Sequence, residues 1–347
     1  MRIRRKIIKL AAAVTCGVLA AGVTFAQPVL AKDTVTVVID AGHGGTGITD
    51  ASELGAVYSG MQEKDMTLKT AFSLKQELEQ YQNVKVYLTR ETDQAMSLKQ
   101  RVDYAQSVGA DILVSVHYNA SSNHNFYGAE IFTSAFGNSF ATGNGLAQSI
   151  MKQWVMNGAV NKGIKTRIGK NGDYYGLIRH GHNKNIPTVI LEHGYIDQPA
   201  DAKRVLSEAS CQQLGVQDAV GIASYYGLKK NKKLTSVRPT VKVKAQKAPV
   251  LPDVTPPENV VFEPVSYDAA MGVLHFKLSA VEPESKLMYY GIGTQNDLTF
   301  QNLNLWDSAS GTMEGSINVG SGYQGTVFMR VYNNYELYTD SLPAVIR

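Results

Sequence analysis

Residues 37–45 of this 347-residue chain read VVIDAGHGG. The β-branched run from Thr34 to Ile39 predicts a buried strand, because branched aliphatic side chains pack well on a pleated sheet. The glycines that follow predict a tight turn, since glycine tolerates backbone conformations and close approaches that other residues resist. His43 is therefore expected just beyond the carboxyl end of a strand, where open α/β sheets bind their ligands.

The alternation of strand and helix patterns continues over residues 34–227. Further β-rich runs occur at 84–89, 111–116, 129–133 and 189–191. Helical spacing of apolar residues appears at 65–81, 97–107 and 139–157, and residues 199–226 carry one or two more helices. Strands that alternate with helices predict an α/β catalytic domain, with a three-layer α/β/α sheet, over residues 32–227.

Four polar side chains are each expected where a strand ends or a helix begins: His43, Glu63, His117 and Glu192. Two imidazoles and one carboxylate form a three-ligand zinc site with an open fourth position, and a further carboxylate can carry the proton in metal-assisted hydrolysis. Structural interpretations remain for three of them: a turn residue for His43, a hydrogen-bonded core histidine for His117 and an ordinary helix N-terminal acid for Glu63. A carboxylate directly after three aliphatic β-residues, as at Glu192, is costly without a function.

Three neighbouring features are open to more than one interpretation. Asp40 is expected either to orient a ligand imidazole or to cap the turn. Three interpretations apply to the pair His180 and His182: a solvated loop pair, a metal site, or a contact with substrate. His193 is a spare imidazole beside Glu192.

At this point the chain resembles the zinc-dependent N-acetylmuramoyl-L-alanine amidases that cleave bacterial cell wall. The resemblance covers about residues 35–226 and is carried by these segments: Ile39–Gly45, Glu63-Lys64-Asp65, Leu88–Asp93, Ser97–Arg101, Gly109–Asp111, Ser115–Ala120 and Pro187–Glu192. It implies that His43, Glu63 and His117 bind Zn2+ and that Glu192 is the catalytic acid/base. It also implies that Thr89, Arg90 and Arg101 are scaffold or rim residues, and that peptidoglycan is the substrate.

The resemblance has one departure, and two other functions compete with it. This family often continues Gly-Phe-x-Ser-Asn after the catalytic acid, whereas His193-Gly194-Tyr195 follows Glu192 here. His193 is therefore expected to alter the pKa or the substrate contacts of that acid. The alternatives are a zinc peptidase that acts within the stem peptide, and a non-catalytic wall-binding or regulatory protein.

The N-terminus predicts export. Residues 1–31 combine five basic residues, an apolar stretch and small-residue cleavage sites after Ala26 or Ala31, which is typical of a signal peptide of a secreted, wall-associated bacterial protein. Without them, 29 basic residues stand against 30 acids, so the charge favours no nucleic-acid partner. Cys211 is then the single cysteine, which excludes an intramolecular disulfide.

The C-terminal part of the chain has a different character. Residues 228–258 hold eight basic residues and five prolines, which predicts an extended linker that either binds anionic wall polymers or serves as a spacer. Residues 259–347 show short β-rich runs separated by Gly, Asn and Asp, which predicts a small all-β sandwich of immunoglobulin-like type.

Overall fold

The computed structural model describes residues 34–47, 50–230, 249–300 and 302–347. The expected signal peptide, residues 1–31, and most of the expected basic linker lie outside the described residues. No helix in the described part of the chain is long and apolar enough to cross a membrane.

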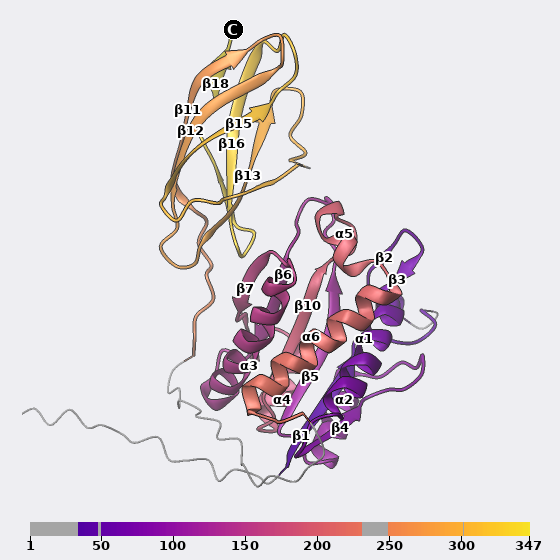
Figure 1. The fold of residues 1–347 in the computed structure, drawn as a ribbon. Coiled ribbons are helices and arrows are strands. Elements are labelled where there is room, and N and C mark those ends of the chain that lie inside the picture. Colours follow the sequence, from indigo (N-terminus) through magenta and orange to yellow (C-terminus); the bar gives the residue numbers. More distant parts are fainter. Residues whose placement is uncertain (1–33, 48–49, 231–248, 301) are drawn as a thin grey trace, which may run out of the picture.

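The N-terminal part is a three-layer α/β domain, as predicted (Figure 1). Its sheet has the order β4-β1-β5-β10-β6-β7, in which β6 runs antiparallel to β10. The strands are β1 Val35–Ala41, β4 Val84–Leu88, β5 Ile112–Asn119, β6 Ala129–Thr133, β7 Asn161–Lys165 and β10 Thr188–Tyr195. Two short hairpins lie outside this sheet: β2 Val57–Tyr58 with β3 Met61–Gln62, and β8 Ile168–Gly169 with β9 Gly172–Asp173. A 3-10 helix spans Ala51–Leu54.

Helices cover both faces of this sheet. One face packs against α1 Glu63–Leu78, α3 Gly137–Met156 and α6 Glu208–Tyr226, which share the largest apolar core. The other face packs against α2 Leu98–Ser107 and α4 Gly176–Asn183 around a smaller core. The short helix α5 Pro199–Val205 follows β10.

Two strands extend beyond their predicted ends. The β-rich runs stopped at Val116 and Leu191, but β5 continues to Asn119 and β10 to Tyr195 because the two strands stay paired, with Glu192 opposite His117. His117 and Glu192 therefore lie inside strands, and the expectation that they follow strand ends is wrong. The sequence patterns also missed β7 and α4, whose segments contain few strongly apolar residues.

The C-terminal part is a two-sheet β-sandwich. One sheet contains β11 Glu258–Asp268, β12 Val273–Val281 and β15 Thr312–Asn318. The other contains β13 Leu287–Thr294, β14 Asn304–Leu305, β16 Gly325–Asn333 and β17 Tyr338–Asp340, with β18 Ala344–Ile346 paired to β16. Alternating side chains such as Phe276 and Met329 fill the core between the sheets.

Candidate metal centre

The two-residue period of the strands sorts the candidate residues onto one face of the sheet. In β1, Val37 and Ile39 pack into the core beneath α1, α3 and α6, so Asp40 points to the opposite face. Asp40 pairs with Ser115 of β5, and His117 pairs with Glu192 of β10. All four side chains therefore project on the α2 and α4 side, on three adjacent strands.

His43, Glu63 and His117 meet in one cluster. His43 sits in the turn after β1 in the left-handed backbone region, with φ of 59°, and Glu63 is the first residue of α1. The Glu63 carboxylate lies between the rings, with Oε2 3.1 Å from His43 Nε2 and Oε1 2.9 Å from His117 Nδ1. One ligand atom from each of the three residues lies within 4.8 Å of the others.

The outer nitrogen of each ring already has a partner. His43 Nδ1 lies 2.7 Å from the backbone oxygen of Ser52, which only accepts, so Nδ1 carries the proton. His117 Nε2 lies 3.1 Å from Ser115 Oγ, whose own proton goes to Asp40 Oδ2 at 2.6 Å. Ser115 must then accept from His117 Nε2. In their neutral form both rings therefore turn an unprotonated nitrogen toward Glu63.

This proton arrangement fits a metal ion. Two imidazole nitrogens and the Glu63 carboxylate converge, and the two carboxylate oxygens also accept the backbone N–H groups of Tyr118 at 3.0 Å and Ala56 at 2.8 Å. At these distances a positive centre must lie between each imidazole nitrogen and the carboxylate, either a proton on a charged ring or one metal ion shared by all three residues. Hydrogen bonds that fix the far nitrogen of a ligand histidine are typical of metal sites. The donor set is also one of those that catalytic zinc uses.

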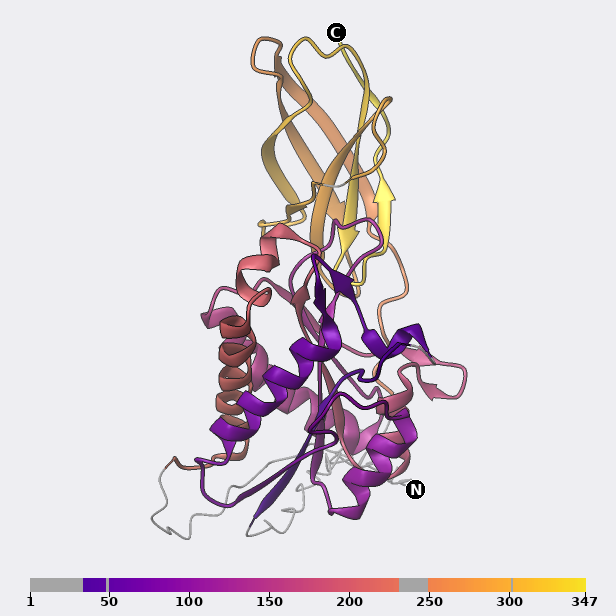
Figure 2. The ribbon, with the colours of Figure 1, turned by 90° about the vertical axis from the view of Figure 1, so that its right-hand side faces the viewer.

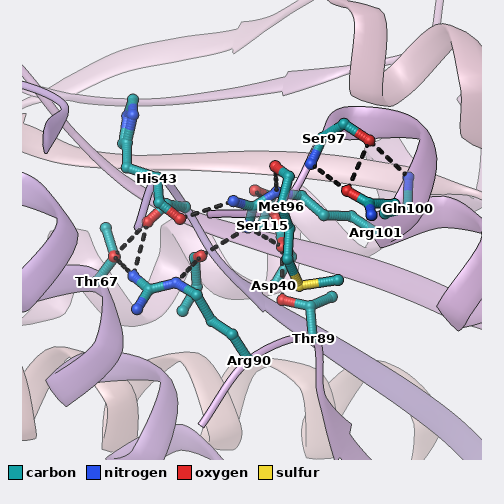
Figure 3. Close-up of polar contacts among 12 residues, drawn as sticks. Asp40, His43, Thr67, Thr89, Arg90, Met96, Ser97, Gln100, Arg101 and Ser115 are labelled. Carbon is teal, nitrogen blue, oxygen red and sulfur yellow. Dashed lines mark hydrogen bonds and ion pairs between the residues drawn. The ribbon is translucent and has the colours of Figure 1, made fainter. Parts of the chain in front are cut away.

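Asp40 anchors the hydrogen-bond network behind the cluster (Figure 3). Its carboxylate is 1% exposed and accepts from Thr89 Oγ1 at 2.7 Å and Arg101 Nη1 at 2.6 Å, besides Ser115. Burial opposes ionisation, but the Arg101 charge and these hydrogen bonds hold the pKa of Asp40 below its usual range. Arg101 Nη2 also donates to the backbone oxygen of His43 at 2.6 Å. One buried ion pair thus positions both histidines.

Two glycines lie too close to the cluster for any side chain. A Cβ on Gly42 would lie 2.3 Å from the His117 ring, and one on Gly55 would lie 2.5 Å from Glu63 Oε2 and 2.7 Å from the His43 ring. Gly55 also has φ of 68°, which other residues rarely adopt. The backbone itself forms part of the wall around the cluster.

Glu192 stands next to the cluster on the neighbouring strand. Its Oε2 is buried and has no hydrogen-bond partner among the described residues. Burial, together with the negative charges of Glu63 and Glu130, raises the pKa of Glu192 well above its usual value. Glu130 lies opposite Glu192 on β6 and pairs with the ammonium group of Lys165. A carboxyl with a raised pKa and a free oxygen is suited to accept and return a proton.

Two cavities adjoin Glu192. One, of about 860 Å³, contains Glu192 together with His43, Glu63 and His117, and reaches past Ser97 of α2's N-terminus. The other, of about 660 Å³, contains Glu192 but none of the three cluster residues. Asn119, Ala120 and Tyr175, like Glu192, line both cavities, so the two cavities lie side by side at Glu192.

The remaining predictions about this region have mixed outcomes. The His193 ring is fully buried on the opposite face of the sheet, between Trp154 and Asp218, and is not among the groups that shift the pKa of Glu192, so the expectation that it alters the pKa or the substrate contacts of that acid is wrong. Asp40 does not contact an imidazole directly, because Ser115 lies between. His182 lies in helix α4 and contacts Ser139, outside the cluster.

The sequence interpretation missed the supporting residues. Ser115 was detectable in principle, because it precedes His117 by two positions in a strand and therefore shares its face. Ser52 and Glu130 carried no such signal, since their roles depend on a loop and on an antiparallel strand pairing. Fold and site together define an α/β protein with a candidate catalytic metal centre.

Comparison with known proteins assigns the family. The family described as N-acetylmuramoyl-L-alanine amidase matches residues 37–224, and the chain belongs to it. It is 33% identical over 199 residues to the N-acetylmuramoyl-L-alanine amidase CwlM of Bacillus licheniformis, covering 57% of this chain and 71% of the relative. It is 29% identical over 198 residues to a sporulation-specific N-acetylmuramoyl-L-alanine amidase of Bacillus subtilis, covering 56% and 70%.

A solved structure is similar in the same region. Cwp6 from Clostridium difficile matches with a TM-score of 0.50 and 34% sequence identity, over 55% of this chain and 29% of that chain. The family match ends at residue 224 and does not include the C-terminal sandwich.

Proposed function

We propose that this chain is a zinc-dependent amidase that cleaves peptidoglycan between the lactyl group of N-acetylmuramic acid and the L-alanine of the stem peptide. Family membership supports the substrate and the bond. The observation that carries the metal assignment is the convergence of three acceptor atoms from His43, Glu63 and His117, each imidazole held with its proton pointing outward.

In this proposal His43, Glu63 and His117 hold the ion, and Asp40, through Ser115, keeps His117 in the required tautomer. A zinc ion in this position supplies Lewis-acid polarisation of the amide carbonyl and makes the attacking water more acidic. The residues of the chain provide the rest of the chemistry.

Glu192 is proposed as the acid/base. As a carboxylate it takes one proton from the attacking water while the oxygen attacks the amide carbon. It then gives that proton to the amide nitrogen as the carbon–nitrogen bond breaks, so that L-alanine leaves with a free amino group. The raised pKa of Glu192 favours holding the proton between these two steps.

Digestion of purified peptidoglycan tests this function. Mass spectrometry should detect intact stem peptides with free L-alanine amino termini, and chelator should abolish their release until zinc is returned. Glu192→Gln should remove activity, whereas the exposed Glu263→Gln should not. Cleavage within the stem peptide would establish the zinc peptidase instead, and wall binding without any cleavage would establish a non-catalytic protein.

We also propose that residues 1–31 direct export and that the basic linker, residues 228–258, attracts anionic wall polymers. Charge attraction of this kind weakens with salt. Binding of the chain to teichoic-acid-bearing wall should therefore fall as sodium chloride rises from 50 to about 500 mM. Salt-independent binding would contradict the electrostatic contribution.

A further inference from the structure

The C-terminal sandwich packs directly on the catalytic domain rather than standing apart from it. Figures 1 and 2 show it at one end of the catalytic domain, beyond β5 and β10. Tyr289 and Tyr332 of the sandwich form an apolar cluster with Phe126, Tyr127 and Val160, which belong to the loops before β6 and β7. This contact buries aromatic surface from both domains and fixes the sandwich on the catalytic domain.

Polar contacts across this interface fix how the sandwich is oriented relative to the catalytic domain. The ammonium group of Lys162 in β7 is completely buried and pairs with Glu336 of the sandwich. Tyr195, the last residue of β10, donates a hydrogen bond to the same Glu336 carboxylate at 2.8 Å. Lys286 donates to the backbone oxygen of Asn161 at 2.7 Å. The turn between β16 and β17, residues 334–337, is thereby held at a set position relative to β10.

That turn forms a wall of the 660 Å³ cavity. Tyr335, Glu336 and Leu337 line it from the sandwich, and Glu192 lines it from β10. The volume lies within the range of sites that bind small ligands or peptide segments. The cavity is therefore shared between the domains and opens beside the proposed acid/base.

Which half of the substrate enters this cavity follows from the chemistry of the proposed function, on which this inference rests. Glu192 must reach the amide nitrogen to protonate it, so the amine half of the substrate begins at Glu192. The carbonyl half must face the metal cluster, which lines the other cavity. We propose that the cavity between the two domains binds the stem peptide, with Tyr335 of the C-terminal sandwich and Arg167 of the catalytic domain as its recognition residues.

One cation of the cavity is suited to such a peptide, because the acids Glu130 and Glu336 already pair with Lys165 and Lys162. Stem peptides carry carboxylates, and Arg167 is an exposed lining residue whose guanidinium stacks on Tyr174 at 3.7 Å and forms no ion pair with any described residue. The guanidinium also donates a hydrogen bond to the Tyr175 side chain, and its remaining donors face a peptide carboxylate, which guanidinium groups bind through paired hydrogen bonds. The Tyr335 ring provides an apolar surface for peptide backbone, and the Lys165 ammonium lies 5.2 Å from its centroid.

Peptide binding by the full-length protein tests the inference independently of turnover. The probe is a synthetic stem tetrapeptide, titrated calorimetrically into metal-free and into zinc-loaded protein. We expect Arg167→Ala and Tyr335→Ala each to weaken binding about tenfold or more in both forms. The control variants are Lys170→Ala and Tyr338→Ala, which change an exposed cation and an exposed tyrosine near these positions but outside the cavity. They should bind as the wild type does.

Kinetics on two substrates separate the possible failures. On intact muropeptide the Arg167 and Tyr335 variants should show a raised KM, whereas on N-acetylmuramoyl-L-alanine, which lacks the rest of the peptide, they should match the wild type. Unchanged peptide binding and KM in an active protein would overturn the inference alone. A wild type inactive on both substrates would overturn the proposed function, and the metal-free titration would still decide whether the cavity binds peptide. Because Tyr335→Ala also alters the interface, Arg167→Ala decides the result if Tyr335→Ala unfolds.

Discussion

Replacing Asp40 with alanine removes a buried carboxylate that accepts hydrogen bonds from Thr89, Arg101 and Ser115 at 2.6–2.7 Å. Arg101, 3% exposed, then loses its counter-charge. Removing one partner of a buried ion pair costs about 3–5 kcal/mol. Arg101 keeps three backbone carbonyl acceptors, which offset part of the loss. We therefore expect the free energy of unfolding of Asp40→Ala to fall by about 3 kcal/mol, the lower end of that range.

Asp40→Asn separates the stability effect from the proton arrangement. The amide oxygen of the asparagine should stay with the donors Arg101 and Thr89, which places its NH2 group against Ser115. Ser115 then accepts from this NH2 group and donates its own proton to His117 Nε2. His117 must carry its proton on Nδ1, toward the metal cluster. We expect a smaller loss of stability than for alanine, but zinc affinity reduced about 10–100-fold.

The stability assay is urea unfolding in the presence of chelator, so that bound metal does not contribute. Zinc affinity is measured by competition with a chromophoric chelator. Asp103→Ala is the control, because Asp103 is a half-exposed surface partner of Lys99 that lies outside the network, and its loss should change neither quantity. The reasoning is refuted if Asp40→Ala unfolds at the wild-type urea concentration, or if Asp40→Asn binds zinc as tightly as the wild type.

Three further outcomes are expected. Gly55→Ala should lose zinc affinity, since its Cβ meets the cluster, while Gly60→Ala, which also has a positive φ but open space around it, should keep it; equal zinc titrations for the two would contradict the close approach. Glu130→Gln should move the acidic limb of the kcat–pH profile to lower pH. Burial and the charges of Glu63 and Glu130 raise the pKa of Glu192, so removing one charge lowers that pKa and keeps the base ionised in more acid solution; an unmoved limb in stopped assays from pH 4 to 8 would count against it. Chelation should lower the thermal unfolding midpoint, because zinc at about 100 times its Kd adds about 2.7 kcal/mol to stability; calorimetry with and without zinc measures the shift, and coincident transitions would exclude a metal bound to the native state.

Periodic patterns predicted most of the catalytic domain correctly. The strand at β1 and the helix at α1 were visible because one side chain in two, or one face of a helix, had to be apolar to pack in the core. In the structure, a capping box of Ser97 and Gln100 also stabilises the first turn of helix α2. Helix α4 and strand β7 could not be predicted from a periodic pattern, because glycine, histidine and lysine dominate them. Their stability comes from neighbours that are distant in the sequence.

Local sequence likewise predicts one part of the candidate site, and contacts between distant segments decide the other part. Local sequence indicates that His43 lies in a glycine-rich turn after a strand, but it ended the strands before His117 and Glu192, which the structure places inside β5 and β10. Strand pairing decides that Glu192 stands opposite His117, because register depends on hydrogen bonds between segments more than 70 residues apart.

By itself, then, the amino-acid order indicated the α/β catalytic domain and the all-β character of the C-terminal part, since both follow from short-range periodicity. It marked His43, Glu63, His117 and Glu192 as candidate site residues through their chemistry and through the resemblance to a known family. Tertiary structure alone decided that His193 faces away from the site, that Ser52 and Asp40 set the imidazole protons, and that Tyr335 borders a cavity beside Glu192. These features depend on burial and on contacts between remote segments, which no local pattern encodes.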